Sequence, residues 1–148
     1  MAQIETIITK VNALNKKSVP FDALLLVGDV TANDLSTEMS FDIPTYFTDG
    51  LEVVEATHRL DSVIPKNITH LGSHGIFTLA TGVKIGFVYG SEEYLSSKSS
   101  DIESVFENSN LDILLTFQWP KAIADEKKLF LFDPNIDKFV EASKPTYH

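Results

Sequence analysis

Apolar residues near the start of the chain recur every three or four positions. Between residues 4 and 14 they fall on one face of a helix, with lysine and asparagine elsewhere, which predicts a surface helix. Residues 23–27 are apolar without interruption and end in Gly28–Asp29, the pattern of a strand buried on both faces. Residues 44–47 predict a second strand, and residues 51–60 predict a helix that leads away from it. Buried strands of this kind are typical of α/β proteins.

Glycines divide the next part of the chain into short β-type runs. Residues 68–71, 75–79 and 83–89 are such runs, and glycine lies between or beside them. Short strands joined by glycine-containing turns usually pair as hairpins. We therefore expect a meander of antiparallel strands in this region.

The C-terminal part alternates helix and strand signals. Ser100, with a glutamate three residues later, has the capping signature of a helix over residues 100–108. Residues 111–116 predict a buried strand that Pro120 follows, and Asp133–Pro134 predicts the start of a last helix. The residues expected to face the core in the two helices are Ile102, Val105, Phe106, Ile136, Phe139 and Val140. No repeat or low-complexity tract interrupts the chain, so we expect a single domain, residues 1–148.

Composition and charge exclude several classes of function. The chain has 43% hydrophobic and 22% charged residues, as ordinary globular domains do. Its formal charge of -9 repels phosphate, so tight direct RNA binding by this domain is not expected. The lack of cysteine removes thiolate metal sites and cysteine nucleophiles. No apolar run is long enough for a membrane span and no signal peptide is evident, so we expect no membrane contact.

The ends of the predicted strands carry the candidate functional residues, because ligands of α/β sheets collect there. Asp29, Asp49, Gln118 and Trp119 occupy such positions. Each aspartate is a candidate metal ligand or general base, but aspartates also cap helices and turns, and both readings stay open. The four histidines are scattered, and no nucleophile elbow or phosphate-binding loop is present.

Five motifs, in order, resemble those of the N-terminal domain of the CwfJ splicing-factor family, a domain similar in fold to calcineurin-like metallophosphoesterases. The motifs are FDALLLVGD at residues 21–29, PTYF at 44–47, NITHLG at 67–72 with GIF at 75–77, DILLT at 112–116 with WPK at 119–121, and KPTYH at 144–148. The resemblance covers about residues 21 to 148. It implies an α/β fold with mixed, metallophosphoesterase-like sheets flanked by helices.

The metal-ligand pattern of metallophosphoesterases is largely missing from the matched positions. The resemblance implies an early Asp-x-His, a Gly-Asp, a Gly-Asn-His and later histidines, but only the Gly-Asp at Asp29 is present. Asp49, Thr116 and Gln118 stand where further ligands belong, so these four residues form a degenerate metal site. One aspartate cannot hold two catalytic cations. We therefore expect no catalysis, no metal and no other cofactor.

The resemblance implies a regulatory module of intron-lariat RNA turnover. The expected partner is the lariat debranching enzyme or a component of the spliceosome, and the expected location is the nucleus, with a cytoplasmic pool left open. Two alternatives remain: a weak phosphoesterase using Asp29 and Asp49 on one metal, and a structural domain that positions a C-terminal RNA-binding region. Longer family members continue beyond the KPTYH motif, so this chain is interpreted as part of a longer protein. This chain lacks the early Asp-x-His motif, which leaves open whether the first strand of the fold is present.

Trp119, Pro120 and Lys121 form the candidate partner surface. Tryptophan is enriched among residues that dominate binding energy, but it is also highly buried on average, so core and interface readings compete. We expect a mixed case in which the indole is partly buried and its edge is exposed at the rim.

Overall fold

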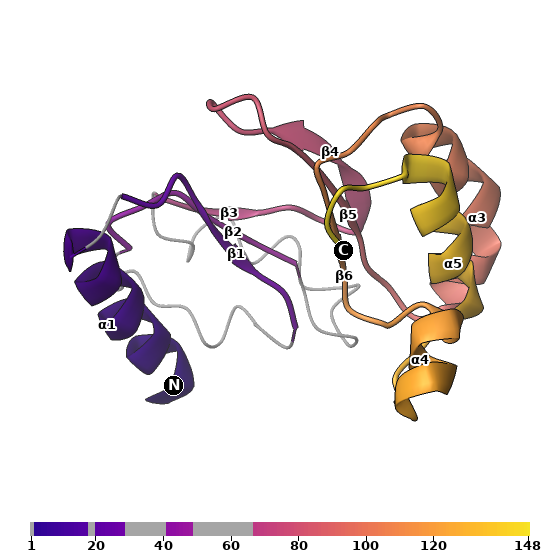
Figure 1. The fold of residues 1–148 in the computed structure, drawn as a ribbon, viewed down its shortest axis with the longest axis horizontal. Helices are drawn as coiled ribbons and strands as arrows, with labels where there is room; N and C mark the ends of the chain where they lie inside the picture. Colours follow the sequence, from indigo (N-terminus) through magenta and orange to yellow (C-terminus); the bar gives the residue numbers. More distant parts are fainter. Residues whose placement is uncertain (1, 18–19, 29–40, 49–66) are drawn as a thin grey trace. The chain divides into compact units, whose positions relative to one another are not determined.

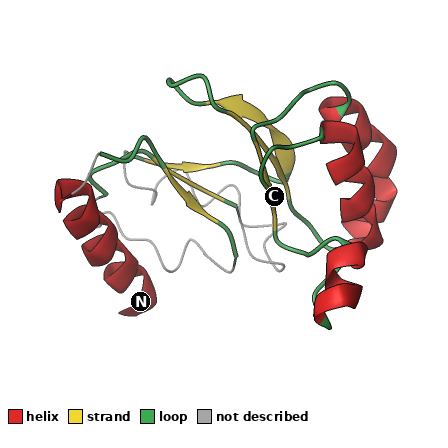
Figure 2. Cartoon of the chain, in the orientation of Figure 1, coloured by secondary structure: helices red, strands yellow, loops and turns green. Residues whose placement is uncertain are grey.

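The computed structural model describes residues 2–17, 20–28, 41–48 and 67–148 (Figure 1). The chain divides into two compact units, residues 1–71 and residues 72–148. Each unit contains a small three-stranded sheet and at least one helix, in agreement with the predicted α/β class (Figure 2). The metallophosphoesterase-like assignment and the single domain stay predictions. None of the described helices is long and apolar enough to cross a lipid bilayer.

The first unit contains helix α1 (Ala2–Lys17) and strands β1 (Leu24–Leu26), β2 (Thr45–Phe47) and β3 (Ile68–His70). The three strands are all parallel, with β2 in the middle. The predicted surface helix is confirmed by α1, and the strand predicted at residues 44–47 is confirmed by β2. The helix predicted at residues 51–60 lies outside the described residues.

The core of the first unit lies between α1 and the parallel sheet. Its buried residues come from the strands and from the segment before β2, and Ile7 and Ile8 of α1 pack against them. These buried residues are Leu26, Phe41, Phe47 and Ile68. The isoleucines are adjacent in sequence and near the middle of α1, so the apolar face predicted for this helix is the one that packs on the core.

Two predictions for these strands are wrong in part. Of the strand predicted at residues 23–27, only Leu26 is buried, because β1 lies at the edge of the described sheet. The strand predicted at residues 68–71 was expected to form a hairpin, but β3 pairs with β2 in parallel. Twenty residues separate Phe47 from Ile68, which is long enough for the crossover that a parallel pair needs.

The second unit contains β4 (His74–Thr78), β5 (Lys84–Val88), α3 (Glu92–Phe106), β6 (Ile113–Thr116), α4 (Lys121–Lys127) and α5 (Pro134–Ser143). Strands β4 and β5 form the predicted antiparallel hairpin, and β5 pairs with β6 in parallel. The last residues of the chain extend this sheet through a bridge between Ile113 and Tyr147. The sheet is therefore mixed, as expected.

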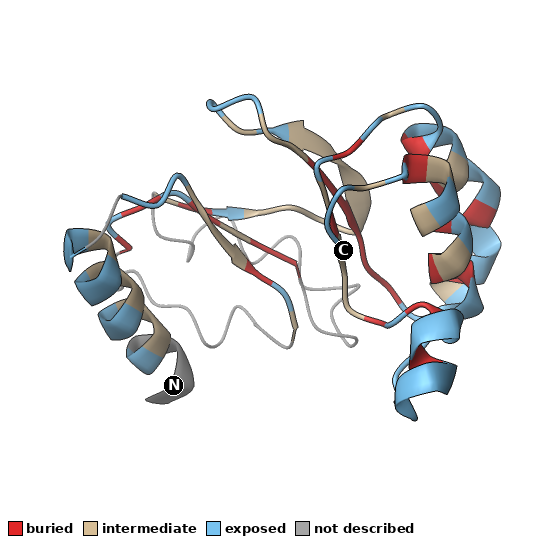
Figure 3. Cartoon of the chain, in the orientation of Figure 1, coloured by how far each residue is buried: buried red, intermediate tan, exposed pale blue. Residues whose placement is uncertain are grey.

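Helices α3 and α5 lie side by side in the same direction (Figure 1). Asn135 Nδ2 donates to Ser96 Oγ at 3.2 Å, and Lys138 Nζ donates to Ser99 Oγ at 3.5 Å. Their inner faces enclose the core, which Figure 3 shows as buried segments. The core residues are Val88, Leu95, Ile102, Phe106, Leu111, Leu114, Ile136 and Phe139. Ile102, Phe106, Ile136 and Phe139 are buried as predicted, whereas Val105 is 42% exposed.

Glycine at position 86 allows the helical layer to approach the sheet. A Cβ atom on Gly86 would lie 2.2 Å from Leu111 Cδ1 and 3.2 Å from a ring carbon of Phe106. A real side chain cannot occupy that space unless the leucine moves. The middle of β5 is therefore glycine because α3 and the segment after it pack directly on the strand.

The start predicted for α3 is wrong. The helix begins at Glu92, and Ser91 caps it by accepting from Tyr94 N at 3.2 Å. Ser100 is exposed within the helix, and the Glu103 carboxylate that was expected to complete its cap accepts instead from Ser99 Oγ at 2.8 Å. Glu92 and Glu93 lie in the first turn, where acidic side chains favour the helix dipole.

Helix α4 was not predicted, whereas α5 begins as expected. Pro120 lies after the end of β6 and has a φ of -57°, which suits the residue before a helix, and Asp137 caps α4 by accepting from Lys121 N at 2.7 Å. Asp133 caps α5 by accepting from Asn135 N at 2.7 Å, with Pro134 in the first turn.

The cap at Ser91 gives a testable stability difference. Replacing Ser91 with alanine should lower the free energy of unfolding by about 1 kcal/mol, because the Tyr94 N–H loses its acceptor. Ser100→Ala should change it by a few tenths at most, because alanine suits a helix interior. Urea denaturation of both variants checks this expectation, and an equal loss in the two would show that the helix is not capped at Ser91.

Candidate functional site

One predicted position of the second unit, Thr116, lies in a row of three residues at one end of the sheet. His74 opens β4, and its register partner is Val88 at the end of β5, whose partner in turn is Thr116 at the end of β6. Residues opposite one another in a sheet point to the same face. One row across the end of the sheet therefore contains His74, Val88 and Thr116. The loops to α3 and α4 leave from this end.

Thr116 is bonded to the C-terminal segment. Its Oγ1 lies 2.8 Å from Nε2 of His148 and donates to the carbonyl of Gln118 at 2.8 Å. Because a hydroxyl has one hydrogen, Thr116 Oγ1 accepts from His148 Nε2. Burial lowers the pKa of His148 below its ordinary value of 6.5, and the Asp137 carboxylate opposes that shift. The neutral form of the imidazole is therefore favoured at this end of the sheet.

Gln118 is buried and joins two strand ends. Its Nε2 donates to the carbonyl of Gly90 at 2.9 Å, in the turn between β5 and α3. Its Oε1 is also buried and has no hydrogen-bond partner among the described residues. A neutral amide fixed in this way positions the turn before Ser91. It does not supply the negative charge with which carboxylates hold catalytic dications.

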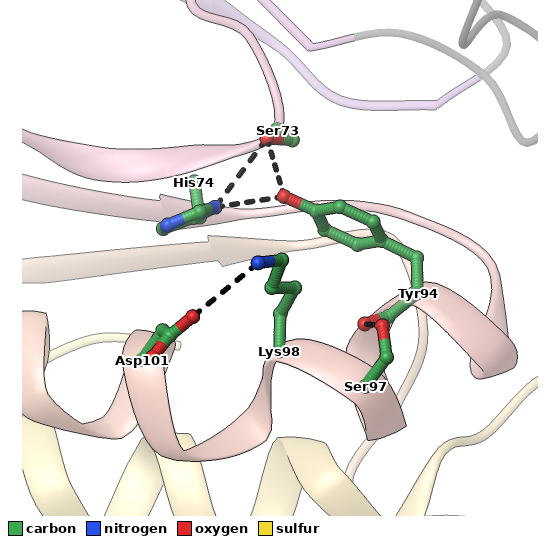
Figure 4. Close-up of polar contacts among 6 residues, drawn as sticks. All are labelled: Ser73, His74, Tyr94, Ser97, Lys98 and Asp101. Carbon is green, nitrogen blue, oxygen red and sulfur yellow. Dashed lines mark hydrogen bonds and ion pairs between the residues drawn. The ribbon is translucent and has the colours of Figure 1, made fainter.

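A hydrogen-bonded cluster that the sequence did not predict connects β4 to α3 (Figure 4). Tyr94 Oη lies 2.9 Å from Ser73 Oγ and 3.1 Å from His74 Nδ1, and Ser73 Oγ lies 3.3 Å from the same nitrogen. His70, four residues before His74, belongs to the first unit, where its ring lies 5.0 Å from that of Phe47. The cluster fixes Tyr94 at the start of α3.

The aspartates of the predicted degenerate metal site lie outside the described residues. This applies to both Asp29 and Asp49. Within the described part of the chain, no group of three histidine, aspartate or glutamate side chains is placed to hold a metal ion. Thr116 and Gln118 are the two predicted positions that can be placed, and both have their side chains bonded within the protein.

Trp119 lies between β6 and α4 and is 45% exposed, which agrees with the mixed case expected from the sequence. It forms a parallel bridge with Phe132: Trp119 N donates to the carbonyl of Leu131 at 3.0 Å, and Asp133 N donates to the carbonyl of Trp119 at 3.2 Å. Pro120 is buried beneath this point. The backbone of Trp119 is thus fixed, while the residue remains partly exposed to solvent.

Further exposed apolar side chains accompany Trp119. Phe130 is 99% exposed, and Leu131 and Phe132 are 40% and 41% exposed. Lys121 Nζ lies 5.1 Å from the centre of the Phe132 ring, a cation–π distance. We call Trp119, Lys121, Phe130, Leu131 and Phe132 the Trp119 patch. Adjoining exposed apolar residues of this kind mark interaction sites more often than scattered ones do.

Sequence reasoning identified Trp119 and Lys121 but missed the other three residues of the patch. The available signal was the apolar run at residues 129–132, which lies directly before the cap of α5. Such a run usually joins the core. Its exposure becomes evident only from the bridge to Trp119, a pairing across thirteen residues of sequence.

Comparison with known proteins relates this chain to CWF19-like proteins. It is 28% identical to a CWF19-like protein 1 homolog of Drosophila melanogaster over 94% of its length, and 29% identical to CWF19-like protein 1 of Homo sapiens over 83%. It is 25% identical to the CWF19-like protein DRN1 of Saccharomyces cerevisiae over 95%. The chain spans 27 to 31% of the length of these three relatives. No family model matches it.

Proposed function

We propose that this chain is a binding module, without catalytic activity of its own, that acts in RNA processing through contact with another protein. The observation that carries the proposal is the Trp119 patch, where a half-exposed tryptophan on a fixed backbone adjoins three more exposed apolar residues. Residues of this type supply most of the binding energy at protein interfaces. The similarity to CWF19-like proteins supports the link to RNA processing.

The resemblance to CwfJ splicing factors makes the proposal more specific. The partner we propose is the lariat debranching enzyme or a spliceosome component, which places the module in the nucleus. A metallophosphoesterase-like fold that has lost its metals is consistent with the parallel strands of the first unit and the mixed sheet of the second. In this account the strand-end edge that holds substrate in an active phosphoesterase serves as a protein-binding rim.

The side chains at the strand ends of the second unit argue against phosphoester hydrolysis. Two-metal hydrolases hold the attacking and leaving oxygens between two cations that carboxylates and imidazoles bind. Here Thr116 and Gln118 stand at the end of β6, and both are neutral and bonded within the protein. One remaining alternative, a single metal on Asp29 and Asp49, predicts a measurable metal content.

Elemental analysis tests this part of the proposal. The purified chain, incubated with manganese, zinc or iron and then desalted, should retain far less than one metal ion per chain, because too few ligands remain. Asp29→Asn serves as the matched variant, and its metal content should equal that of the unchanged chain. About one metal ion per chain, lost in Asp29→Asn, would favour the phosphoesterase instead.

A further inference from the structure

We propose that the Trp119 patch binds an extended, acidic segment of a partner protein that carries apolar side chains. This inference rests on the proposed function and specifies the chemistry of the partner at the same surface. Three observations support it: an unpaired backbone edge, a set of exposed apolar side chains, and an exposed lysine that has no ion pair among the described residues.

The backbone at Phe132 offers an edge for a peptide in extended conformation. In the parallel bridge, the carbonyl of Leu131 and the N–H of Asp133 point toward Trp119. The N–H and carbonyl of Phe132 between them therefore point to the opposite side. Neither has a hydrogen-bond partner in the part of the chain that the structure describes. An added strand satisfies such groups, and its alternate side chains then face the neighbouring apolar surface.

The side chains around this edge need an apolar partner. Phe130 is almost fully exposed, and Trp119, Leu131 and Phe132 are each exposed by 40 to 45%. A purely polar peptide cannot remove this surface from water, whereas leucine or phenylalanine at every second position can. The partner segment therefore contains apolar residues that alternate with polar ones.

The charges near the patch favour acidic residues at the polar positions of the partner segment. Residues 119–132 contain three lysines and two acidic residues, and two further carboxylates lie beside them: Asp133 is buried, and Asp137 accepts from the backbone N–H groups of Lys121 and Ala122 at the start of α4. Asp125 and Glu126 are each paired with a lysine, at 2.9 Å from Lys121 and 2.8 Å from Lys127. Lys128, two residues before Phe130, is exposed and has no ion pair with any described residue. Lys128 is therefore the residue with which a carboxylate of the partner forms an ion pair.

The groove between α3 and α5 favours basic rather than acidic ligands. This groove of about 450 Å³ is lined by Glu103, Glu107 and Glu141, against the single cation Lys138. An acidic peptide is repelled there and attracted by the Trp119 patch, so the two surfaces separate ligands by charge. A phosphatidylserine membrane would suit the lysines and exposed phenylalanines of the patch, but it is a broad anionic surface that also faces the acidic remainder of the chain, whereas a short segment contacts the patch alone. The observations therefore favour a protein segment.

Trp119 is the only tryptophan in the chain, so its fluorescence reports on this patch alone. The probe is a synthetic tryptophan-free peptide in which leucine or phenylalanine alternates with aspartate or glutamate, titrated into the full 148-residue chain. We expect a saturable blue shift of the emission. A peptide with lysine in place of each acidic residue should bind at least about tenfold more weakly, and proline at its centre should weaken the acidic peptide similarly by removing a backbone donor.

Matched variants connect the signal to the patch. Phe130→Ser should weaken binding of the acidic peptide about tenfold, whereas Val105→Ser, at an exposed position on α3, should not change it. Lys128→Glu should weaken binding several-fold more than Lys98→Glu, because Lys98 lies on α3 beside Asp101. Unchanged melting curves for all four variants would show that each difference reflects binding.

Three results would overturn the inference. One is an equal or larger shift with the lysine peptide, and another is no response to the acidic peptide. The third is a shift with vesicles of phosphatidylcholine and phosphatidylserine that exceeds the shift with the acidic peptide. The proposed function is judged separately with purified debranching enzyme: if the enzyme shifts the Trp119 emission and the acidic peptide does not, the module stands and the acidic segment is wrong.

Discussion

Replacing Trp119 with alanine is expected to weaken capture of the partner protein by about ten- to a hundredfold while leaving the chain folded. Trp119 is 45% exposed as a residue, so removal of its side chain takes away less burial than in a core tryptophan and should cost about 1–2 kcal/mol of unfolding free energy. The bridge to Phe132 uses only backbone atoms and does not depend on the side chain. Urea denaturation and a binding titration on the same preparation measure the two effects.

Trp119→Phe is the matched control for this variant. It keeps an aromatic anchor, so folding should be unaffected and most of the affinity should remain. A loss of about 3–5 kcal/mol of unfolding free energy in Trp119→Ala would show that Trp119 is a core residue instead. If Trp119→Ala melts like the unchanged chain and captures the partner equally well, the partner surface lies elsewhere.

Phe139 should show the opposite behaviour, with a large effect on stability. Its side chain is fully buried at the centre of the second unit, and its ring packs edge-to-face on Phe106 at 6.2 Å between centroids. Phe139→Ala therefore leaves a cavity between α3 and α5 and should lower the unfolding free energy by about 3–5 kcal/mol.

The measurement for Phe139 is urea denaturation followed by far-ultraviolet circular dichroism. Val105→Ala, at an exposed position on α3, is the control and should lose less than about 1 kcal/mol. If Phe139→Ala lost no more unfolding free energy than Val105→Ala, the packing described for the second unit would be contradicted. Together with Trp119, these variants separate an aromatic residue that stabilises the fold from one that is available for binding.

The elements predicted correctly are those whose signals are local. The start of α5 follows from Asp133 and Pro134, which cap and open the helix through neighbouring atoms. The hairpin of β4 and β5 follows from two β-type runs joined by a short turn that contains Gly82. In such cases a few consecutive residues determine the geometry, so the sequence pattern is sufficient.

The errors concern choices that depend on distant parts of the chain. Either Ser91 or Ser100 could cap a helix in this segment. Because Ser91 is the cap, α3 begins soon after β5 and places about two more turns against the core. Whether β3 pairs with β2 or with β4 depends on the crossover before it, which its own residues do not specify. Val105 is adjacent in sequence to the buried Phe106 but lies on the exposed side of α3.

The candidate site was predictable in part for the same reason. Trp119 could be identified because it follows a clear strand, and its partial exposure agrees with its position between a strand and a helix. Phe130, Leu131 and Phe132 could not, because an apolar run normally indicates core and only the bridge to Trp119 brings it to the surface. The roles of Asp29 and Asp49 stay predictions, since both lie outside the described residues.

The most direct test of the central claim is hydrogen exchange on the 148-residue chain mixed with purified lariat debranching enzyme. If the chain is a binding module that uses the Trp119 patch, a complex should form, and amide exchange should slow in residues 119–132. The outer face of α3, which carries no part of the patch, should exchange at an unchanged rate. Protection confined to residues outside 119–132 would contradict the account, whereas absence of a complex at micromolar concentrations would exclude the debranching enzyme and leave a spliceosome component as the proposed partner.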